Sequence, residues 1–148
     1  CRGVVKSVCR NRWSLWHNFP PLHGSPGTND ATAIQSAAEL GKEWAGTRDI
    51  KEVEEILTTA IHNFLRIVRD CNPKANIIWG YGMLGDSFLP VIREAVETYA
   101  EQTADSQIHF LQLPDTTPDT VGSRLHPGVR AHQNVARILE NYLREKLS

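Results

Sequence analysis

The residue best suited to proton transfer is His126, in the run Ser123-Arg124-Leu125-His126-Pro127-Gly128 directly before a helix-like segment. Pro127 suits the first position of a helix, because its missing N–H and fixed φ cost nothing there. A histidine held at the entrance to a packed helix is well placed to act as a general base or acid. The alternative is a surface or capping histidine, and the spacing alone leaves both open.

A second candidate is Asn29, in the run Gly27-Thr28-Asn29-Asp30. An Asn side chain and the N–H groups of a turn can stabilise the oxyanion that develops during acyl transfer. The same residue types also occur in ordinary turns, where they form local hydrogen bonds. The run therefore indicates either an oxyanion hole or a plain turn.

Gly85-Asp86-Ser87 resembles the surroundings of a nucleophilic serine. Asp86 and Ser87 are equally suitable as N-cap residues of the helix expected to follow, so we interpret Ser87 as a decoy. Trp79, Tyr81 and Met83 could line a substrate pocket, although Trp79 could equally belong to the core of a sheet.

The histidines and cysteines show no metal-binding pattern. His126 and His132 are six residues apart and do not share a helix face as paired ligands do. We expect His132 to face the core. Three scattered cysteines predict no disulfide framework, and no Cys/His pair has zinc spacing. We expect no metal and no cofactor.

Apolar periodicity predicts the elements that position these residues. Helices are expected over 31–44, 50–70 and 87–102 and from 127 to near the end, and strands over 75–82 and 107–113. Asp49-x-x-Glu52 is a capping pattern for the second helix. The apolar face of the last helix is expected to consist of Val129, His132, Val135/Ala136, Leu139 and Tyr142/Leu143.

Strands that alternate with amphipathic helices predict right-handed crossovers and a parallel α/β sheet. Reactive groups gather at the carboxyl ends of the strands in such sheets. We therefore expect residues 27–30 and the loop 114–126 at that edge.

The net charge of the 148 residues is −1, which does not favour binding to nucleic acid or to an anionic membrane. No apolar run approaches the roughly 18 residues of a membrane span, and no signal peptide is visible. A soluble protein is expected, with its compartment unknown.

The first part of the chain has a different composition. Residues 1–29 contain four basic side chains and no carboxylate before Asp30, and three prolines stand where a central strand would precede residue 27. We interpret residues 1–26 as an atypical segment, as a frame-shifted or non-native sequence would give, and residues 27–148 as the domain.

The GTND turn, the strand ending in IIWGYGM and the HPG junction together resemble the SGNH (GDSL) hydrolase superfamily, and within it the acetyl-xylan-esterase-like carbohydrate esterases of family two. The resemblance covers residues 24–148. It implies the carboxyl-terminal portion of a three-layer α/β/α, flavodoxin-like fold. It also implies a serine esterase that removes O-acyl groups, chiefly O-acetyl, from carbohydrates through an acyl-enzyme. His126 matches the general base and acid of the family, and Asn29 its oxyanion-hole asparagine.

The sequence departs from the family in two ways. The G-D-S block that carries the nucleophile precedes GTND in the family and is not visible here, so the nucleophile is unknown. Arg124 and Ser123 occupy the positions where the family often has an acid. We therefore predict that the chain is inactive as it stands and associates through an uncovered sheet edge. The alternative is a non-catalytic module that binds carbohydrate or a protein.

Overall fold

The computed structural model describes residues 49–147. The helix predicted over 31–44, the boundary at residue 26 and Asn29 lie outside these residues. The described elements, in chain order, are α3 (Ile50–Cys71), β1 (Ile77–Tyr81), α4 (Leu89–Gln102), β2 (Ile108–Gln112), a 3-10 helix η2 (Ser123–Leu125) and α5 (Val129–Leu147).

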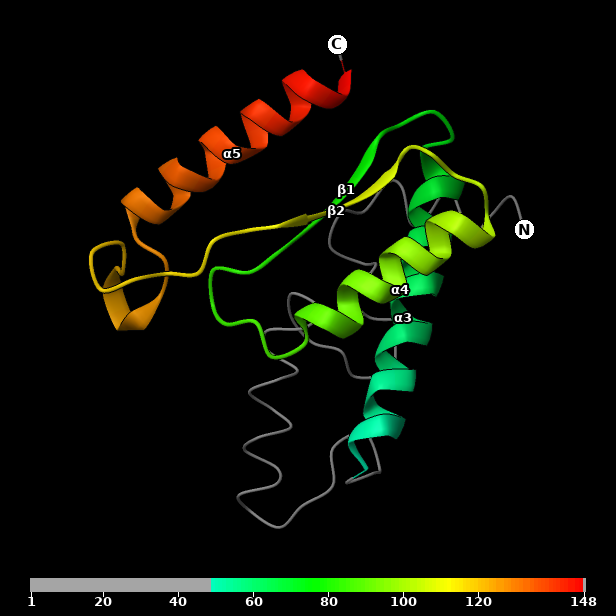
Figure 1. Ribbon diagram of the computed structural model, residues 1–148, viewed down its shortest axis with the longest axis horizontal. Helices are drawn as coiled ribbons and strands as arrows, with labels where there is room; N and C mark the ends of the chain where they lie inside the picture. The colour runs from blue at the N-terminus through cyan, green and yellow to red at the C-terminus, as the bar shows by residue number, and fades with distance from the viewer. Residues whose placement is uncertain (1–48, 148) are drawn as a thin grey trace.

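The two strands form a parallel pair. Their register runs from Ile77 opposite Ile108 to Tyr81 opposite Gln112, and α4 makes the crossover between them. Figure 1 shows α3 and α4 on one side of the strands and α5 on the other. The α/β class with a parallel sheet flanked by helices is thus confirmed.

The core lies between α3, α4 and one face of the sheet. The most deeply buried side chains recur at three- and four-residue steps on the two helices, as one helical face requires; they are Leu57, Ile61, Leu65, Ile92 and Val96. Alternate strand residues point toward them, namely Ile77, Trp79, Tyr81, Ile108 and Phe110.

Polar contacts fix both ends of α3. Asp49 is its N-cap, and the Asp49 carboxylate accepts a hydrogen bond from the Lys51 N–H at 2.9 Å. At the other end, the Arg69 guanidinium donates to both carboxylate oxygens of Asp105, at 2.7 and 3.1 Å. It also donates to the carbonyls of Asn72 and Ala75, and so ties α3 to the segments that precede β1 and β2.

The capping expected of Asp86 and Ser87 is wrong. The N-cap of α4 is Phe88, which makes no side-chain cap. The reason is a turn in which the Leu89 N–H donates to the Asp86 carbonyl at 2.8 Å. Asp86 and Ser87 therefore lie before the helix.

The last helix, α5, differs from the prediction both in its first residue and in the face that it buries. It begins at Val129, because Pro127 instead forms an antiparallel bridge with Val121. Val129 is 73% exposed, and His132 is exposed rather than facing the core. Val135, Leu139, Tyr142 and Leu143 are partly buried as expected, but the rest of the inner stripe is shifted to Ala131 and Ile138, which also repeat at helical spacing. Periodicity alone allowed either stripe.

Cys71 is disulfide-bonded, and an odd number of cysteines still permits one bridge. None of the described helices is both long and apolar enough to cross a membrane.

Candidate active site at the carboxyl edge of the sheet

The loop after β1 begins with an unusual backbone. Gly82 has φ +138°, and a Cβ there would collide with the carbonyl group of Leu113. Only glycine fits this position, because it combines positive φ with close backbone approach. The next residue, Met83, also has a positive φ of 74°.

The loops that follow the two strands are joined to each other. The Thr116 hydroxyl and N–H donate to the Met83 carbonyl at 2.6 and 3.2 Å. The Gly85 N–H donates to the Asp115 carboxylate at 3.0 Å. These bonds hold the segment containing Met83 beside the start of the loop that leads to His126.

The segment from Thr120 to Gly128 closes on itself and presents His126. The Gly122 N–H donates to the His126 carbonyl at 2.6 Å, and the Gly128 N–H donates to the Thr120 carbonyl at 2.8 Å. A Cβ on Gly122 would lie 2.9 Å from the Gly128 Cα, and a Cβ on Gly128 would lie 2.8 Å from the Thr120 carbonyl oxygen. The two glycines thus permit the close approach that shapes this loop.

Backbone strain is concentrated in the same two loops. Arg124 and Leu125, directly before His126, have φ values of 54° and 62°. Non-glycine residues in this region cost on the order of 1–3 kcal/mol each, and such strain clusters at functional sites. With Met83, they make three of the four non-glycine positive-φ residues found between residues 49 and 147.

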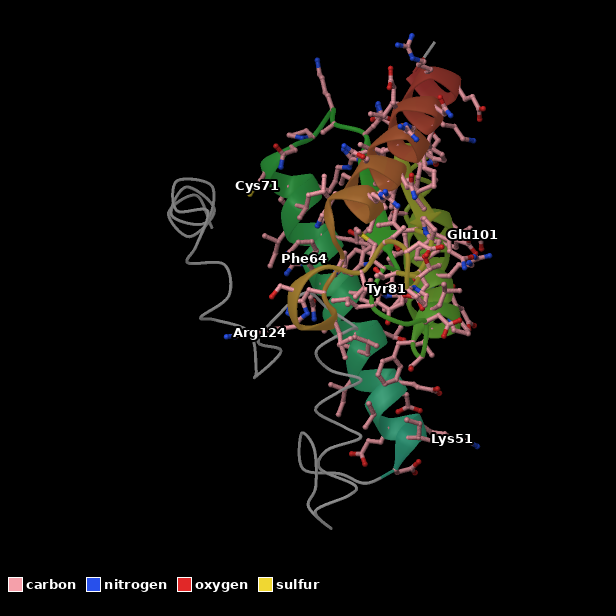
Figure 2. All side chains as sticks on the ribbon, turned by 90° about the vertical axis from the view of Figure 1, so that its left-hand side faces the viewer. Lys51, Phe64, Cys71, Tyr81, Glu101 and Arg124 are labelled. Carbon is pink, nitrogen blue, oxygen red and sulfur yellow. The ribbon has the colours of Figure 1, made fainter. Side chains whose placement is uncertain are left out.

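The His126 side chain is exposed, and Figure 1 shows its loop beyond the carboxyl ends of β1 and β2. This is the edge expected from the sequence. Between residues 49 and 147, no side chain or backbone group forms a hydrogen bond or ion pair with the imidazole. Figure 2 shows Arg124, two residues before His126, pointing away from the body of the protein.

The other predicted site residues occupy different places. Tyr81 is 4% exposed, and Trp79 packs edge-on against Phe64 with ring centroids 5.6 Å apart. Both belong to the α3–α4 side, where the structure gives them a packing role. Met83 lies partly buried in the joined loops, and Ser87 is exposed in the turn before α4. A role of Trp79, Tyr81 and Met83 in substrate binding stays a prediction, and so does the interpretation of Ser87 as a decoy.

Comparisons with family models and with curated proteins give no match. A comparison of structures finds an acetyl xylan esterase from the rumen bacterium Butyrivibrio proteoclasticus, with 39% sequence identity and a TM-score of 0.70. The match covers 82% of this chain and 35% of that one. The chain resembles part of an acetyl xylan esterase. The resemblance expected from the sequence is therefore confirmed, and the esterase-like chain spans about a third of the length of the protein it matches.

Sequence reasoning missed the contacts that shape the site. Nothing in the sequence pattern marks Asp115 and Thr116, yet they join the two loops. The pairing of Gly122 with Gly128 was also missed. The sequence signal for this pairing is one glycine before the candidate histidine and one glycine after it.

Proposed function

We propose that this chain carries the histidine-bearing part of a serine-type esterase that removes O-acetyl groups from carbohydrates. The observation that carries the proposal is an exposed His126, presented by a strained loop at the carboxyl edge of a parallel sheet. The likeness to an acetyl xylan esterase supports it.

The chemistry proceeds through two acyl transfers. His126 takes the proton of a serine hydroxyl as that oxygen attacks the ester carbonyl, and returns the proton to the sugar hydroxyl that leaves. An acyl-serine remains. His126 then takes a proton from water as the water attacks the acyl-serine, and returns that proton to the serine oxygen as acetic acid leaves. Asn29 donates hydrogen bonds to the oxyanion in both tetrahedral intermediates.

The family's nucleophilic serine lies in a G-D-S block before the GTND run, and this chain has no such block there. The serines between residues 49 and 147 are Ser87, Ser106 and Ser123. Of these, Ser87 alone has a nucleophile-like context, and it stands in the turn before α4 rather than in the block expected upstream of residue 27. We therefore propose that the chain alone does not hydrolyse esters.

The first test is an assay of the purified chain with an aryl acetate. We expect no turnover above that of a His126→Ala variant. Clear turnover that disappears in Ser87→Ala would identify Ser87 as the nucleophile and overturn this part of the proposal.

The second test concerns the substrate. A chimera is made in which residues 49–147 of this chain replace the matching segment of the Butyrivibrio esterase. Acetate release from acetylated xylan by this chimera is measured. We expect release by the chimera, with aryl acetate cleaved faster than an aryl ester of a long-chain acid. A folded chimera that cleaves only the long-chain ester would show that O-acetyl groups are not the substrate.

The alternative is a module that binds carbohydrate without cleaving it. It is favoured by the His126 imidazole, which has no hydrogen-bond partner between residues 49 and 147. Binding of a glycan by a chimera that is folded but inactive would support this alternative.

A further inference from the structure

Charge is distributed unevenly along the described chain. Residues 49–119 contain twelve carboxylates and five lysines and arginines. Residues 120–139, which form the loop of His126 and the first half of α5, contain three arginines and two histidines and no carboxylate. The segment that contains the candidate catalytic histidine is therefore cationic, although Asp119 lies directly before it and the rest of the described chain is acidic.

The three arginines of this segment are available to a ligand. Arg124, Arg130 and Arg137 are all exposed. Between residues 49 and 147, no hydrogen bond or ion pair engages their side chains. The other described arginines are different: Arg66, Arg69 and Arg144 each lie in a salt bridge, and Arg93 donates a hydrogen bond to the Gln112 side chain and lies over the Phe110 ring.

The exposed polar residues of α5 form a continuous strip. Arg130 and Arg137 are seven residues apart, which places them on the same face of a helix and about 10 Å apart along its axis. Gln133 and Asn134 lie between them on that face, and both are exposed. Arg124 stands in the loop that leads directly into α5. We call these five residues the α5 arginine strip.

The strip combines two kinds of recognition group. Guanidinium groups bind carboxylates through paired hydrogen bonds. Side-chain amides donate and accept, so they suit sugar hydroxyls. The strip starts within a few residues of His126, so a chain that lies along it can extend to the candidate active site.

We propose that the α5 arginine strip binds a carbohydrate chain that carries carboxylate groups, and that it holds such a chain against His126. This inference rests on the proposed function for the part played by His126. It names the substrate class of that site as an acidic, O-acetylated polysaccharide.

A single-stranded nucleic acid is the competing polyanion. Proteins that bind single strands stack the bases on aromatic side chains. Residues 120–139 contain no Phe, Tyr or Trp. A run of uronic acid residues needs no such stacking, and its carboxylates can pair with the guanidinium groups of the strip.

The test uses the full chain and three probes: polygalacturonate oligomers, neutral xylo-oligosaccharides of equal length, and a single-stranded DNA oligonucleotide. The dissociation constants are measured at low and at physiological salt. The double variant Arg130→Gln/Arg137→Gln removes both charges while keeping a good helix former. Arg66→Gln is the matched control, because it removes one exposed arginine from α3.

We expect polygalacturonate to bind more tightly than the neutral oligomers, and the binding to weaken with salt. The double variant should bind it about tenfold more weakly, as expected for two exposed ion pairs. Arg66→Gln should bind as the unchanged chain does. No binding of polygalacturonate, equal binding of the neutral oligomers, or an unaffected double variant would each overturn the inference. Tighter binding of the oligonucleotide would do the same.

Failure of this inference can be separated from failure of the proposed function. An aryl acetate is small and uncharged, so its hydrolysis does not depend on the strip. If the chimera hydrolyses aryl acetate but the chain binds no polygalacturonate, only the inference fails. If the chain binds polygalacturonate but the chimera is inactive, only the proposed function fails.

Discussion

Two glycines set how closely the loop around His126 can fold on itself. Gly122 and Gly128 each donate a backbone hydrogen bond across the loop, and each leaves no room for a Cβ. The positive φ values of Arg124 and Leu125 are sustained by this closure, because strained residues persist only where the surroundings fix them. The position of the imidazole thus depends on residues that carry no chemistry.

Gly122→Ala is expected to destabilise the protein by about 1–3 kcal/mol, as overpacking does. The added methyl group meets the backbone of Gly128, which cannot move aside as a side chain can. Chemical denaturation measures the change. Gly80→Ala is the control, since its Cβ would meet only the flexible side chain of Leu113, at 3.3 Å. Equal stability of Gly122→Ala and the unchanged chain would show that the loop is not closed as described.

At the residue scale, sequence patterns predicted where the histidine stands but not how it is held. The HPG run indicated a loop that enters a helix, and the loop does lie at the carboxyl edge. Backbone contacts within a loop, such as the close approach of Gly122 and Gly128, leave no periodic signal. The same holds for the burial of Tyr81, which depends on how the strand is covered.

At the scale of elements, the face of α3 that contacts α4 supplies much of the core. Val53, Leu57, Ile61 and Leu65 are each at most 2% exposed and repeat every four residues. This stripe was predictable because α3 has one apolar face. The inner face of α5 was not, because two neighbouring stripes of that helix both have apolar residues at helical spacing. The burial of Ala131 and the exposure of Val129 and His132 show which one docks, and Tyr142 contacts His109 on β2 with ring centroids 6.1 Å apart.

Leu65→Ala should lower the free energy of unfolding by about 2–5 kcal/mol, because it removes a fully buried side chain and leaves a cavity. Ile50→Ala on the same helix should cost much less, since Ile50 is 51% exposed. Urea denaturation of both variants provides the comparison. Similar losses in the two would mean that α3 does not pack through the Leu65 stripe.

The docking of α5 predicts a pH dependence of stability. Burial raises the pKa of Tyr142 above its ordinary value of 10.0. The folded protein therefore keeps the phenol neutral where the unfolded chain ionises it. The contribution of Tyr142 is then present below the unfolded pKa and is lost as the pH rises through the raised folded pKa.

Tyr142→Phe cannot ionise, so its denaturation midpoint should fall less steeply above about pH 10 than that of the unchanged chain. Burial also raises the pKa of Tyr99, so part of the alkaline loss should remain in the variant. Identical alkaline profiles for Tyr142→Phe and the unchanged chain would contradict the docking of α5 through this residue.

For the molecule as a whole, the alternation of strands and helices was enough to predict a parallel α/β sheet, because crossovers restrict the possible topologies. The order of elements from residue 50 onward is as predicted. The charge pattern is a feature of the whole molecule that the net charge of −1 conceals. Segments of opposite charge cancel in the net charge, so the net charge gave no indication of the cationic segment around His126.

Each strand has one hydrogen-bonded neighbour within residues 49–147. Association of copies through an uncovered edge therefore stays a prediction. Sedimentation of the purified chain over a range of concentrations should show a mass that rises with concentration. A single monomeric species at all concentrations would contradict it.

The central claim is that His126 is the general base of an esterase site. Its most direct test is kcat/KM for aryl acetate hydrolysis by the chimera of residues 49–147 with the Butyrivibrio esterase. Each variant is first checked for cooperative melting. We expect the chimera to be active, His126→Ala to lower kcat/KM by about a thousandfold or more, and Ser87→Ala to leave it unchanged. A folded chimera without activity, or one whose activity survives His126→Ala, would contradict the claim.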